Sequence, residues 1–418
     1  MSGIWQKPWY QTLCPYCFRR FRLKDAHLRP LFSEEGNVEN DRLMHEFLYP
    51  DEQSPPALTP AIVPAKATFL VELWKSLRLD NDITRTHDRI CPHCHLPLPQ
   101  ALAKGQASSH TIAIVGEGAS GKSAYFGVLA HQLIENPQMA EAGLAAWPQD
   151  SFDAAGVMKA CTSVLWRDRY GTYLFPDDPS SQRSVPPTTD TRATNKSVRT
   201  PLIYRIQDFS TARNSPYSHS KAVDFVVYDA AGEDIENKRN MERWGRYITE
   251  SSAILFLIDP SRFAHVRNSL ADVDTGTSRT GRSSAVLDYI VDRFERQQLL
   301  SPTDPIPVPI VFSIMKSDLL KTILPQSSRI PLDSYHRGGV DLEDIQLVSQ
   351  EIESLLHGWG EGNFLAKCRR FSNSCFCAVS AVGEQPGPDN TFSDLRPIRV
   401  LDPLFWILHK LGYARAIS

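Results

Sequence analysis

The sequence has no long apolar run and little net charge, and each absence removes a class of function. No apolar run approaches the roughly 20 residues needed to cross a bilayer. The first residues, "MSGIWQKPWYQTLCPYC", have neither the basic start nor the apolar stretch of a signal peptide. We therefore expect a cytoplasmic protein. The formal net charge is -3, so no overall field draws the chain to nucleic acid or to an anionic membrane. It contains no internal repeat and no long low-complexity tract.

The length and composition predict a globular protein of two or three domains. The chain has 418 residues, of which 42% are hydrophobic and 22% charged, as in ordinary globular proteins. Eight cysteines are present. In a reducing compartment, closely spaced thiols hold metal more often than they form disulfides.

Two regions of the chain, residues 1–105 and residues 106–418, differ in composition and in hydrophobic pattern, and we expect them to be separate domains. The first is rich in proline and contains one convincing helix, at 67–80. In the second, apolar strands alternate with amphipathic helices, which predicts a three-layer α/β/α domain with a mostly parallel sheet. The expected strands are "TIAIV", "PLIYRI", "VDFVVYD", "AILFLID", "VPIVFSIM" and "CFCAVS". The expected helices are "KSAYFGVLAHQLIE", "ERWGRYITES", "SSAVLDYIVDRFERQQLL" and "LEDIQLVSQEIESLLHGW". Polar stretches predict inserted or mobile segments near 136–200, 262–285 and 321–340.

The segment "GEGASGKS" follows the first of these strands and precedes the first helix. It fits the phosphate-loop pattern G-x-x-x-x-G-K-S, in which backbone N–H groups and a helix N-terminus surround phosphate oxygens. We expect Lys122 to reach the β- and γ-phosphates and Ser123 to bind Mg²⁺. The predicted nucleotide-binding residues here are Gly116, Glu117, Gly118, Ala119, Ser120, Gly121, Lys122, Ser123 and Ala124.

Three later motifs resemble those of the Ras-like P-loop GTPase superfamily. "YDAAGED" resembles D-x-x-G, which implies that Asp229 contacts Mg²⁺ and Gly232 the γ-phosphate. "MKSD" resembles [N/T]-K-x-D, in which Lys316 and Asp318 would bind the guanine nucleotide. Asp318 would accept hydrogen bonds from guanine N1 and its exocyclic amine. Ser380 and Ala381 resemble the S-A element that reads guanine O6. Each motif ends a predicted strand, at the edge where α/β sheets bind ligands.

Two features depart from that superfamily pattern. Met315 replaces the Asn or Thr whose side chain helps to brace the loops. The phosphate loop and Asp229 are also far apart, which requires the insertion near 136–200. An ATPase would use Asp259 for Mg²⁺, but this alternative leaves Asp229 and Asp318 unexplained. We expect a structural role for Asp259.

The resemblance also requires a switch threonine and a group that positions water. "VPPTT" favours Thr189 as the Mg²⁺ ligand, with Thr188 next. Glu233 stands where Ras has the glutamine that orients the attacking water. A carboxylate there predicts slow intrinsic hydrolysis, with Lys122, Glu233 and Thr189 as the catalytic residues.

Two C-P-x-C pairs predict a small zinc ribbon or treble clef in the first region. Cys14, Cys17, Cys91 and Cys94 would give four thiolates to one tetrahedral Zn²⁺. His93 and His95 are alternative ligands that we expect at the surface. Cys161, Cys368, Cys375 and Cys377 are expected in the core. The basic segment "CFRRFRLK" makes nucleic-acid binding an option, although docking of a protein partner is favoured.

The zinc ribbon, "YDAAGED", "LIDPS" and the closing "LDPLFWILHKL" together resemble a narrower group, the bacterial double GTPases of conflict and defence systems. The resemblance implies a GTP-hydrolysing switch that controls a partner protein, with another GTPase as one such partner. Its cofactors would be GTP or GDP, Mg²⁺ and structural Zn²⁺. The alternative is a nucleotide-bound scaffold, or a zinc-ribbon binding module, with little hydrolysis.

Overall fold

The computed structural model describes most of the chain in several stretches. These are residues 11–31, 37–48, 58–64, 87–103, 108–116, 120–152, 159–178, 180–186, 201–209, 222–227, 245–270, 283–298, 300–387 and 389–417. The expected helix at 67–80 lies outside them.

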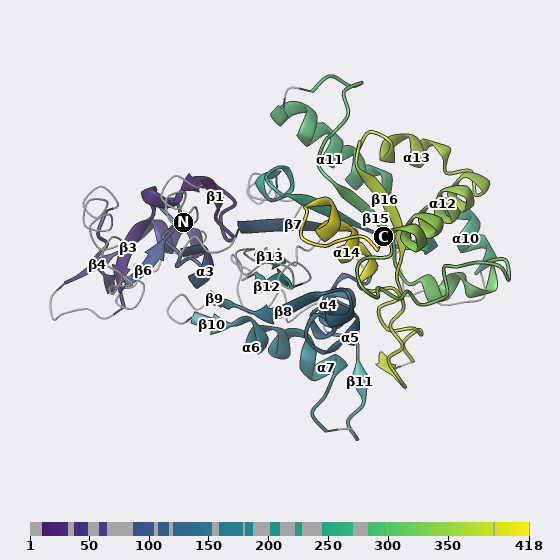
Figure 1. The fold of residues 1–418 in the computed structure, drawn as a ribbon, viewed down its shortest axis with the longest axis horizontal. Helices are drawn as coiled ribbons and strands as arrows, with labels where there is room; N and C mark the ends of the chain where they lie inside the picture. The colour runs from purple at the N-terminus through teal and green to yellow at the C-terminus, as the bar shows by residue number, and fades with distance from the viewer. Residues whose placement is uncertain are drawn as a thin grey trace.

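A seven-stranded sheet forms the centre of the molecule (Figure 1). Its order is β16-β15-β14-β7-β13-β12-β8. Neighbouring strands from β16 to β13 are parallel, whereas β12 is antiparallel to both β13 and β8. The strands are β7 (Ser108–Gly116), β8 (Leu144–Pro148), β12 (Leu202–Asp208), β13 (Ala222–Val227), β14 (Ala253–Ile258), β15 (Ile310–Ile314) and β16 (Ser374–Ala378). This confirms the mostly parallel sheet, and places the phosphate-loop strand β7 inside it.

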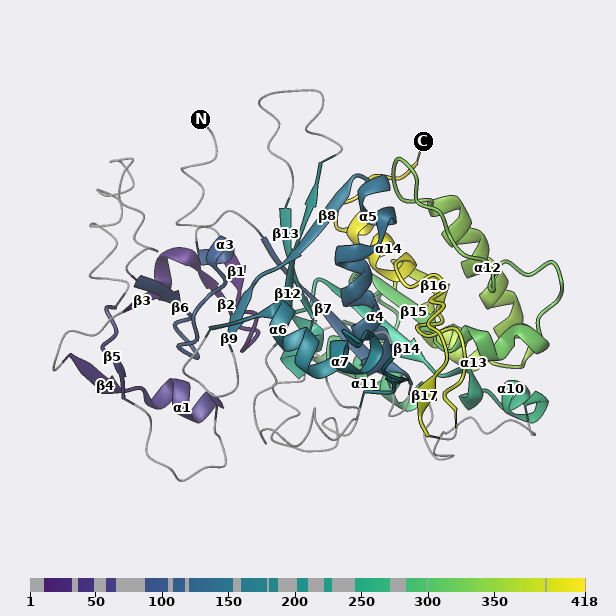
Figure 2. The same ribbon diagram turned by 90° about the horizontal axis from the view of Figure 1, so that it is seen from below.

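Helices cover both faces of the sheet (Figure 2). Helices α4 (Lys122–Glu135) and α14 (Asp402–Lys410) pack into the apolar cluster on one face. The helical residues 245–249, α10 (Ala264–Ser269), α11 (Ser283–Gln298) and α13 (Gly362–Cys368) pack into the cluster on the other. Helix α12 (Leu342–Gly358) contributes to both and lies along β16. The expected three layers are therefore present.

The insertion after α4 adds regular structure that the sequence pattern did not reveal. It supplies the edge strand β8, which pairs with β12. Its other elements are α5 (Pro137–Glu141), β9 (Asp150–Phe152), β10 (Lys159–Cys161), α6 (Thr162–Trp166), the π-helical turn η3 (Arg167–Gly171), α7 (Thr172–Leu174) and β11 (Arg183–Ser184), which pairs with β17 (Thr391–Phe392).

The segment near 321–340, expected to be inserted or mobile, is held by buried side chains within residues 325–339. Its His336 is fully buried and bonds through Nε2 to Asp402 Oδ1, 3.0 Å away. Ser334 Oγ donates to the same oxygen at 2.5 Å. Arg399 completes the cluster by donating to Asp402 Oδ2 at 2.8 Å. Because buried charges are costly unless they are paired, this network holds the segment against the start of α14.

The N-terminal part builds a separate small core beside the beginning of β7 (Figure 1). The described residues of this part form three antiparallel pairs, and the insertion between the cysteine pairs provides most of their strands. Its elements are β1 (Gln11–Leu13), β2 (Arg20–Arg22), η1 (Leu23–Asp25), β3 (His27–Pro30), β4 (Val38–Asn40), α1 (Arg42–Leu48), β5 (Leu58–Pro60), β6 (His87–Ile90) and α3 (Gln100–Ala103). Across the described stretches of the whole chain, no helix is both long and apolar enough to span a membrane.

Candidate nucleotide site and metal centre

The carboxyl ends of four adjacent parallel strands meet at one edge of the sheet. Gly116 at the end of β7 pairs with Leu257 of β14. Ile258 of β14 pairs with Ile314 of β15, which pairs with Ala378 of β16. Strand β7 lies between β13 and β14, and the strands that follow it in sequence are added first on one side of it and then on the other. Open α/β sheets bind ligands in the crevice outside such a point.

Both outer glycines of the phosphate-loop pattern have a structural reason to be glycine. A Cβ on Gly116 would lie 2.7 Å from the carbonyl oxygen of Leu257, too close for any side chain. Gly121 has φ +84°, a left-handed conformation that residues with a Cβ rarely adopt. Both ends of the Gly116–Lys122 turn therefore favour glycine, as in a loop around phosphate oxygens.

The lysine of the pattern points back into this turn. Lys122 begins α4, its residue is only 9% exposed, and its Nζ donates to the carbonyl oxygen of Gly116 at 2.6 Å. Ser120 is buried at the same turn, and within the described stretches its Oγ has no hydrogen-bond partner. Ser123 and Ala124 lie in the first turn of α4, half-buried. The helix N-terminus and the ammonium together give this turn a positive potential suited to an anion.

The structure brings two other predicted motifs into contact. Asp318 lies in η6 (Ser317–Thr322), directly after β15, and its Oδ1 accepts from Ser380 Oγ at 2.5 Å. The same hydroxyl accepts from the backbone N–H of Gly383 at 2.9 Å. Ala381 is buried beside it. Asp318 and Ser380 lie 62 positions apart in the sequence. They meet because β15 and β16 are neighbours in the sheet.

Asp259 uses both carboxylate oxygens within the protein. Its Oδ1 accepts from the N–H of Ser261 at 2.9 Å and from the Ser261 hydroxyl at 2.7 Å. Its Oδ2 accepts from Lys316 Nζ at 2.9 Å. These bonds fit the structural role that the sequence predicts for Asp259. The Asp259–Lys316 pair is a feature that the sequence reasoning missed, although Asp259 was itself singled out.

Several predicted site residues lie outside the described stretches, so their positions stay predictions. These are Glu117, Gly118, Ala119, Thr188, Thr189, Asp229, Gly232 and Glu233.

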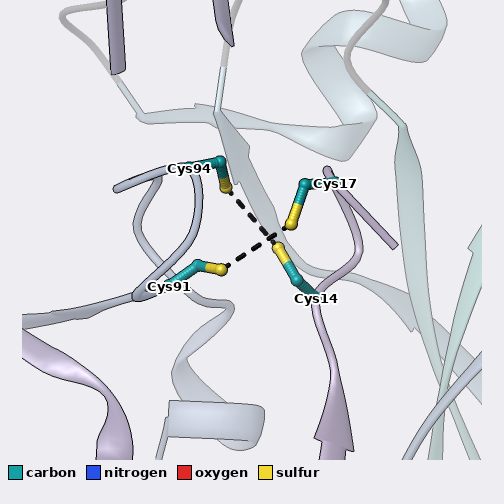
Figure 3. A group of neighbouring side chains, drawn as sticks. All are labelled: Cys14, Cys17, Cys91 and Cys94. Atoms are coloured by element: carbon teal, nitrogen blue, oxygen red, sulfur yellow. Dashed lines mark hydrogen bonds between the residues drawn. The ribbon is translucent and has the colours of Figure 1, made fainter. Parts of the chain in front are cut away.

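The second candidate site is formed by the four predicted zinc ligands (Figure 3). All four sulfurs lie within 4.8 Å of one another and all four residues are buried. The Sγ atoms of Cys14 and Cys94 are 3.8 Å apart, as are those of Cys17 and Cys91. Four thiolates at the usual Zn–S distance of about 2.3 Å from one tetrahedral ion would be about 3.8 Å apart. The cluster therefore fits Zn²⁺, with no other partner required.

Two matching turns aim these sulfurs inward. The N–H of Phe18 donates to the carbonyl oxygen of Cys14, and the N–H of His95 to that of Cys91. Phe18 and His95 both have left-handed backbones, with φ of 54° and 56°. Each C-P-x-C pair thus forms the same knuckle turn, which ends in a left-handed residue.

One expectation about the neighbouring histidines is wrong. His93 is exposed, as expected, but His95 is half-buried and its Nδ1 lies 2.9 Å from Oδ1 of Asp41. Asp41 also forms a buried ion pair with Arg29 and accepts from the N–H of Met44. These bonds join the second knuckle to β3 and α1.

The remaining cysteines are distributed as a core would require. Cys368, Cys375 and Cys377 are buried, in agreement with the prediction. Burial raises the pKa of the Cys368 thiol, so it is an unreactive core group. The side chain of Cys161 lies outside the described part.

Comparison with known proteins finds a relative by sequence and a likeness to a solved structure. No family model matches the chain. A protein of Mycolicibacterium smegmatis (strain ATCC 700084 / mc(2)155) named "Putative ESX-1 scaffolding and assembly protein SaeC" is 26% identical over 349 residues, which cover 77% of this chain and 80% of that protein. The crystal structure of Era in complex with MgGDPNP and a segment of 16S ribosomal RNA is 13% identical and covers 75% of this chain, with a TM-score of 0.26. This chain spans 59% of the Era chain. The TM-score is too low for that likeness to support a fold or a function.

Proposed function

We propose that the chain is a GTP-binding and GTP-hydrolysing switch that controls a partner protein in the cytoplasm. The observation that carries the proposal is the Ser380–Asp318 contact at 2.5 Å, at the same sheet edge as the Gly116–Lys122 turn. In this proposal the Gly116–Lys122 turn would bind the phosphates and Asp318 would bind the base, as the sequence motifs predict. Asp318 provides the acceptor that separates guanine from adenine.

In this proposal, Ser123, Asp229 and Thr189 would hold Mg²⁺, which would supply positive charge to stabilise the phosphates during hydrolysis. Lys122 would neutralise the negative charge of the same phosphates. Glu233 would sit beside the attacking water and set a slow rate of turnover. Structural Zn²⁺ would be bound by the four clustered cysteines.

A second candidate function has its own support. The relative from M. smegmatis is named for scaffolding and assembly, which favours a nucleotide-bound scaffold that works by holding other proteins. Both candidates need a protein partner. They differ in whether GTP is turned over. The conflict or defence role implied by the narrower resemblance stays a prediction, as do a GTPase partner and nucleic-acid binding by the zinc module.

Nucleotide affinity tests the shared part of both candidates. We expect GDP to bind at least a hundredfold more tightly than ADP, because adenine leaves the carboxylate acceptors of Asp318 unpaired. Asp318→Asn should weaken GDP binding and favour XDP, since an amide offers one acceptor to xanthine N1–H and one donor to its O2. Equal affinity of the unmutated protein for GDP and ADP would contradict the guanine site.

Phosphate release then separates the two candidates. A switch should release phosphate over many turnovers, whereas a scaffold should stop near one equivalent or none. Glu233→Ala should slow single-turnover hydrolysis with little change in affinity if Glu233 orients water. If Glu233 instead mainly repels the γ-phosphate, the variant should bind GTP more tightly.

A further inference from the structure

Met315 leaves the base-recognition loop without the brace that its motif normally provides. The residue is 1% exposed, and its thioether sulfur accepts from Ser313 Oγ at 3.6 Å. A thioether is a weak acceptor and donates no hydrogen bond. Backbone bonds tie the loop to its neighbours, from the Met315 N–H to the carbonyl oxygen of Ile258 and from the Ser317 N–H to that of Val379. A side-chain brace, however, has to come from another residue.

Asp259 provides such a connection. Its side chain has 0% exposure, at the end of β14, and Ser261 fixes one of its oxygens by two hydrogen bonds. The other oxygen pairs with Lys316 Nζ at 2.9 Å. The pair thus joins the loop after β14 to the loop after β15. A buried carboxylate that is fixed by other bonds gives its ionic partner a defined position.

Lys316 is also the residue at which the loop turns toward the base site. Its backbone is left-handed, with φ 50° and ψ 42°, and it caps η6. This conformation is unfavourable for a residue with a Cβ, so neighbouring contacts must hold it. Asp318 follows two residues later, inside the turn that Lys316 begins.

We propose that Asp259 is a positioning residue for guanine recognition: through Lys316 it places Asp318, and it replaces the brace lost with Met315. The inference rests on the proposed guanine site and adds a specificity determinant to it. Asp259 does not touch the nucleotide in this role. Its effect is confined to the base, and it falls most heavily on the contact from Asp318 to the exocyclic amine.

The test compares GDP with IDP, which lacks that amine, in the Asp259→Asn variant. The substitution keeps the side-chain volume and an acceptor for Ser261 but removes the charge. We expect the affinity for GDP to fall about tenfold, as for the loss of one well-placed charge-assisted bond. Affinity for IDP should fall much less, so the GDP/IDP ratio should shrink. Equilibrium titration at one salt concentration measures both.

Two further variants make the result specific. Asp288→Asn breaks another lysine–aspartate pair, Lys367 Nζ to Asp288 at 2.7 Å between α13 and α11, and should leave the ratio unchanged. Met315→Asn added to Asp259→Asn should recover part of the ratio, because it restores the motif's own brace. If Asp259→Asn does not fold, Lys316→Gln removes the same pair from a side chain that is 29% exposed.

The outcomes separate the two levels of inference. If the unmutated protein binds no guanine nucleotide, the proposed function and this role both fail. If it binds GDP and Asp259→Asn keeps the GDP/IDP ratio, only the positioning role is wrong. An equal loss for GDP and IDP also overturns it, since Asp259 would then support the fold alone.

Discussion

The N-terminal part and the sheet reach a stable core by different means. The sheet carries apolar clusters on both faces, in which strands and helices bury large side chains such as Phe256, Phe312 and Phe405 completely. The N-terminal cluster is much smaller and includes all four clustered cysteines. Small cores rarely offset the entropy of folding without a metal or disulfide. We therefore expect bound Zn²⁺ to contribute the folding free energy that side-chain burial does not provide in the N-terminal part.

A short junction connects the two cores. Phe18, which ends the first knuckle, packs in the cluster of the sheet, with its ring 5.0 Å from that of Tyr247. The Tyr247 hydroxyl donates to the carbonyl oxygen of Ile112 and accepts from the N–H of Ile114, both in β7. Arg20 adds an exposed ion pair with Glu250 at 2.6 Å. The zinc knuckle therefore contacts the helical residues 245–249 that follow the predicted D-x-x-G segment.

Metal removal should have the largest effect, because it should unfold the N-terminal part and leave the sheet folded. Structural zinc contributes about 10–16 kcal/mol to the folding of small zinc modules. Chelation or Cys91→Ser should unfold residues 11–103 while the sheet stays folded. Elemental analysis should give about one Zn per chain before treatment, and hydrogen exchange should locate the unfolding.

Cys368→Ser is the matched control, because Cys368 is buried outside the zinc cluster. It should keep the metal. A metal-free preparation in which the N-terminal part is still protected from exchange would contradict the role of zinc.

Lys122→Ala should disable the sheet's site and leave the zinc module intact. Losing the ammonium at the phosphate turn should weaken GTP binding at least a thousandfold, about 4 kcal/mol. Lys321→Ala, at an exposed lysine of η6, should bind as the unmutated protein does. Titration with GTP and zinc analysis measure the two regions separately. Hydrolysis by Lys122→Ala at the unmutated rate would refute the phosphate loop.

Phe18→Ala should separate the two regions. Removing a buried phenyl ring costs about 3–5 kcal/mol, here where the N-terminal part inserts a side chain into the cluster of the sheet. We expect one calorimetric transition to divide into two. Arg20→Gln should have a much smaller effect, since exposed ion pairs contribute at most about 1 kcal/mol. Equal effects of the two variants would show that the junction is not apolar.

Local pattern was enough to locate most of the sheet. The strand and helix around the phosphate loop were predicted within a few residues, because an apolar run, a glycine turn and an amphipathic helix each leave a strong local signal. The motifs after β15 and β16 were each predicted at the carboxyl end of a strand, so they were expected at the same edge of the sheet. The contact between Ser380 and Asp318 follows that expectation.

Features that depend on distant partners were not visible. The edge strand β8 reads "LAAWP" and has no β-branched residue, so its strand state comes from pairing with β12. The segment 325–339 reads as polar, but two of its polar side chains, Ser334 and His336, are buried and both bond to Asp402, more than 60 residues further along the chain. The Asp259–Lys316 pair likewise joins positions 57 residues apart, for which no local pattern exists.

The smallest expected effect concerns pH and His110, which lies near the junction. Its Nδ1 is 2.7 Å from Ser252 Oγ and its Nε2 is 3.0 Å from the hydroxyl of Tyr413. Burial, and then the positive charge of Arg20, lower the pKa of His110 to about 4. Between pH 6.5 and 4 the unfolded chain therefore binds a proton that the folded protein does not. Stability should fall as the pH falls through this range, by about 1 kcal/mol at pH 5.5 and at most about 3 kcal/mol.

The variant His110→Gln should remove this part of the pH dependence, while the other titrating groups keep theirs. The difference in unfolding free energy between the two proteins should therefore be flat above pH 7 and change between pH 6.5 and 4. Arg20→Gln should raise the pKa of His110 in the folded protein, because it removes the nearby cation contributed by the zinc module. NMR titration of the imidazole measures that shift directly. A pKa near 6.5 in the unmutated protein would contradict the buried, neutral imidazole, and no response to Arg20→Gln would mean that the two regions do not meet electrostatically at this histidine.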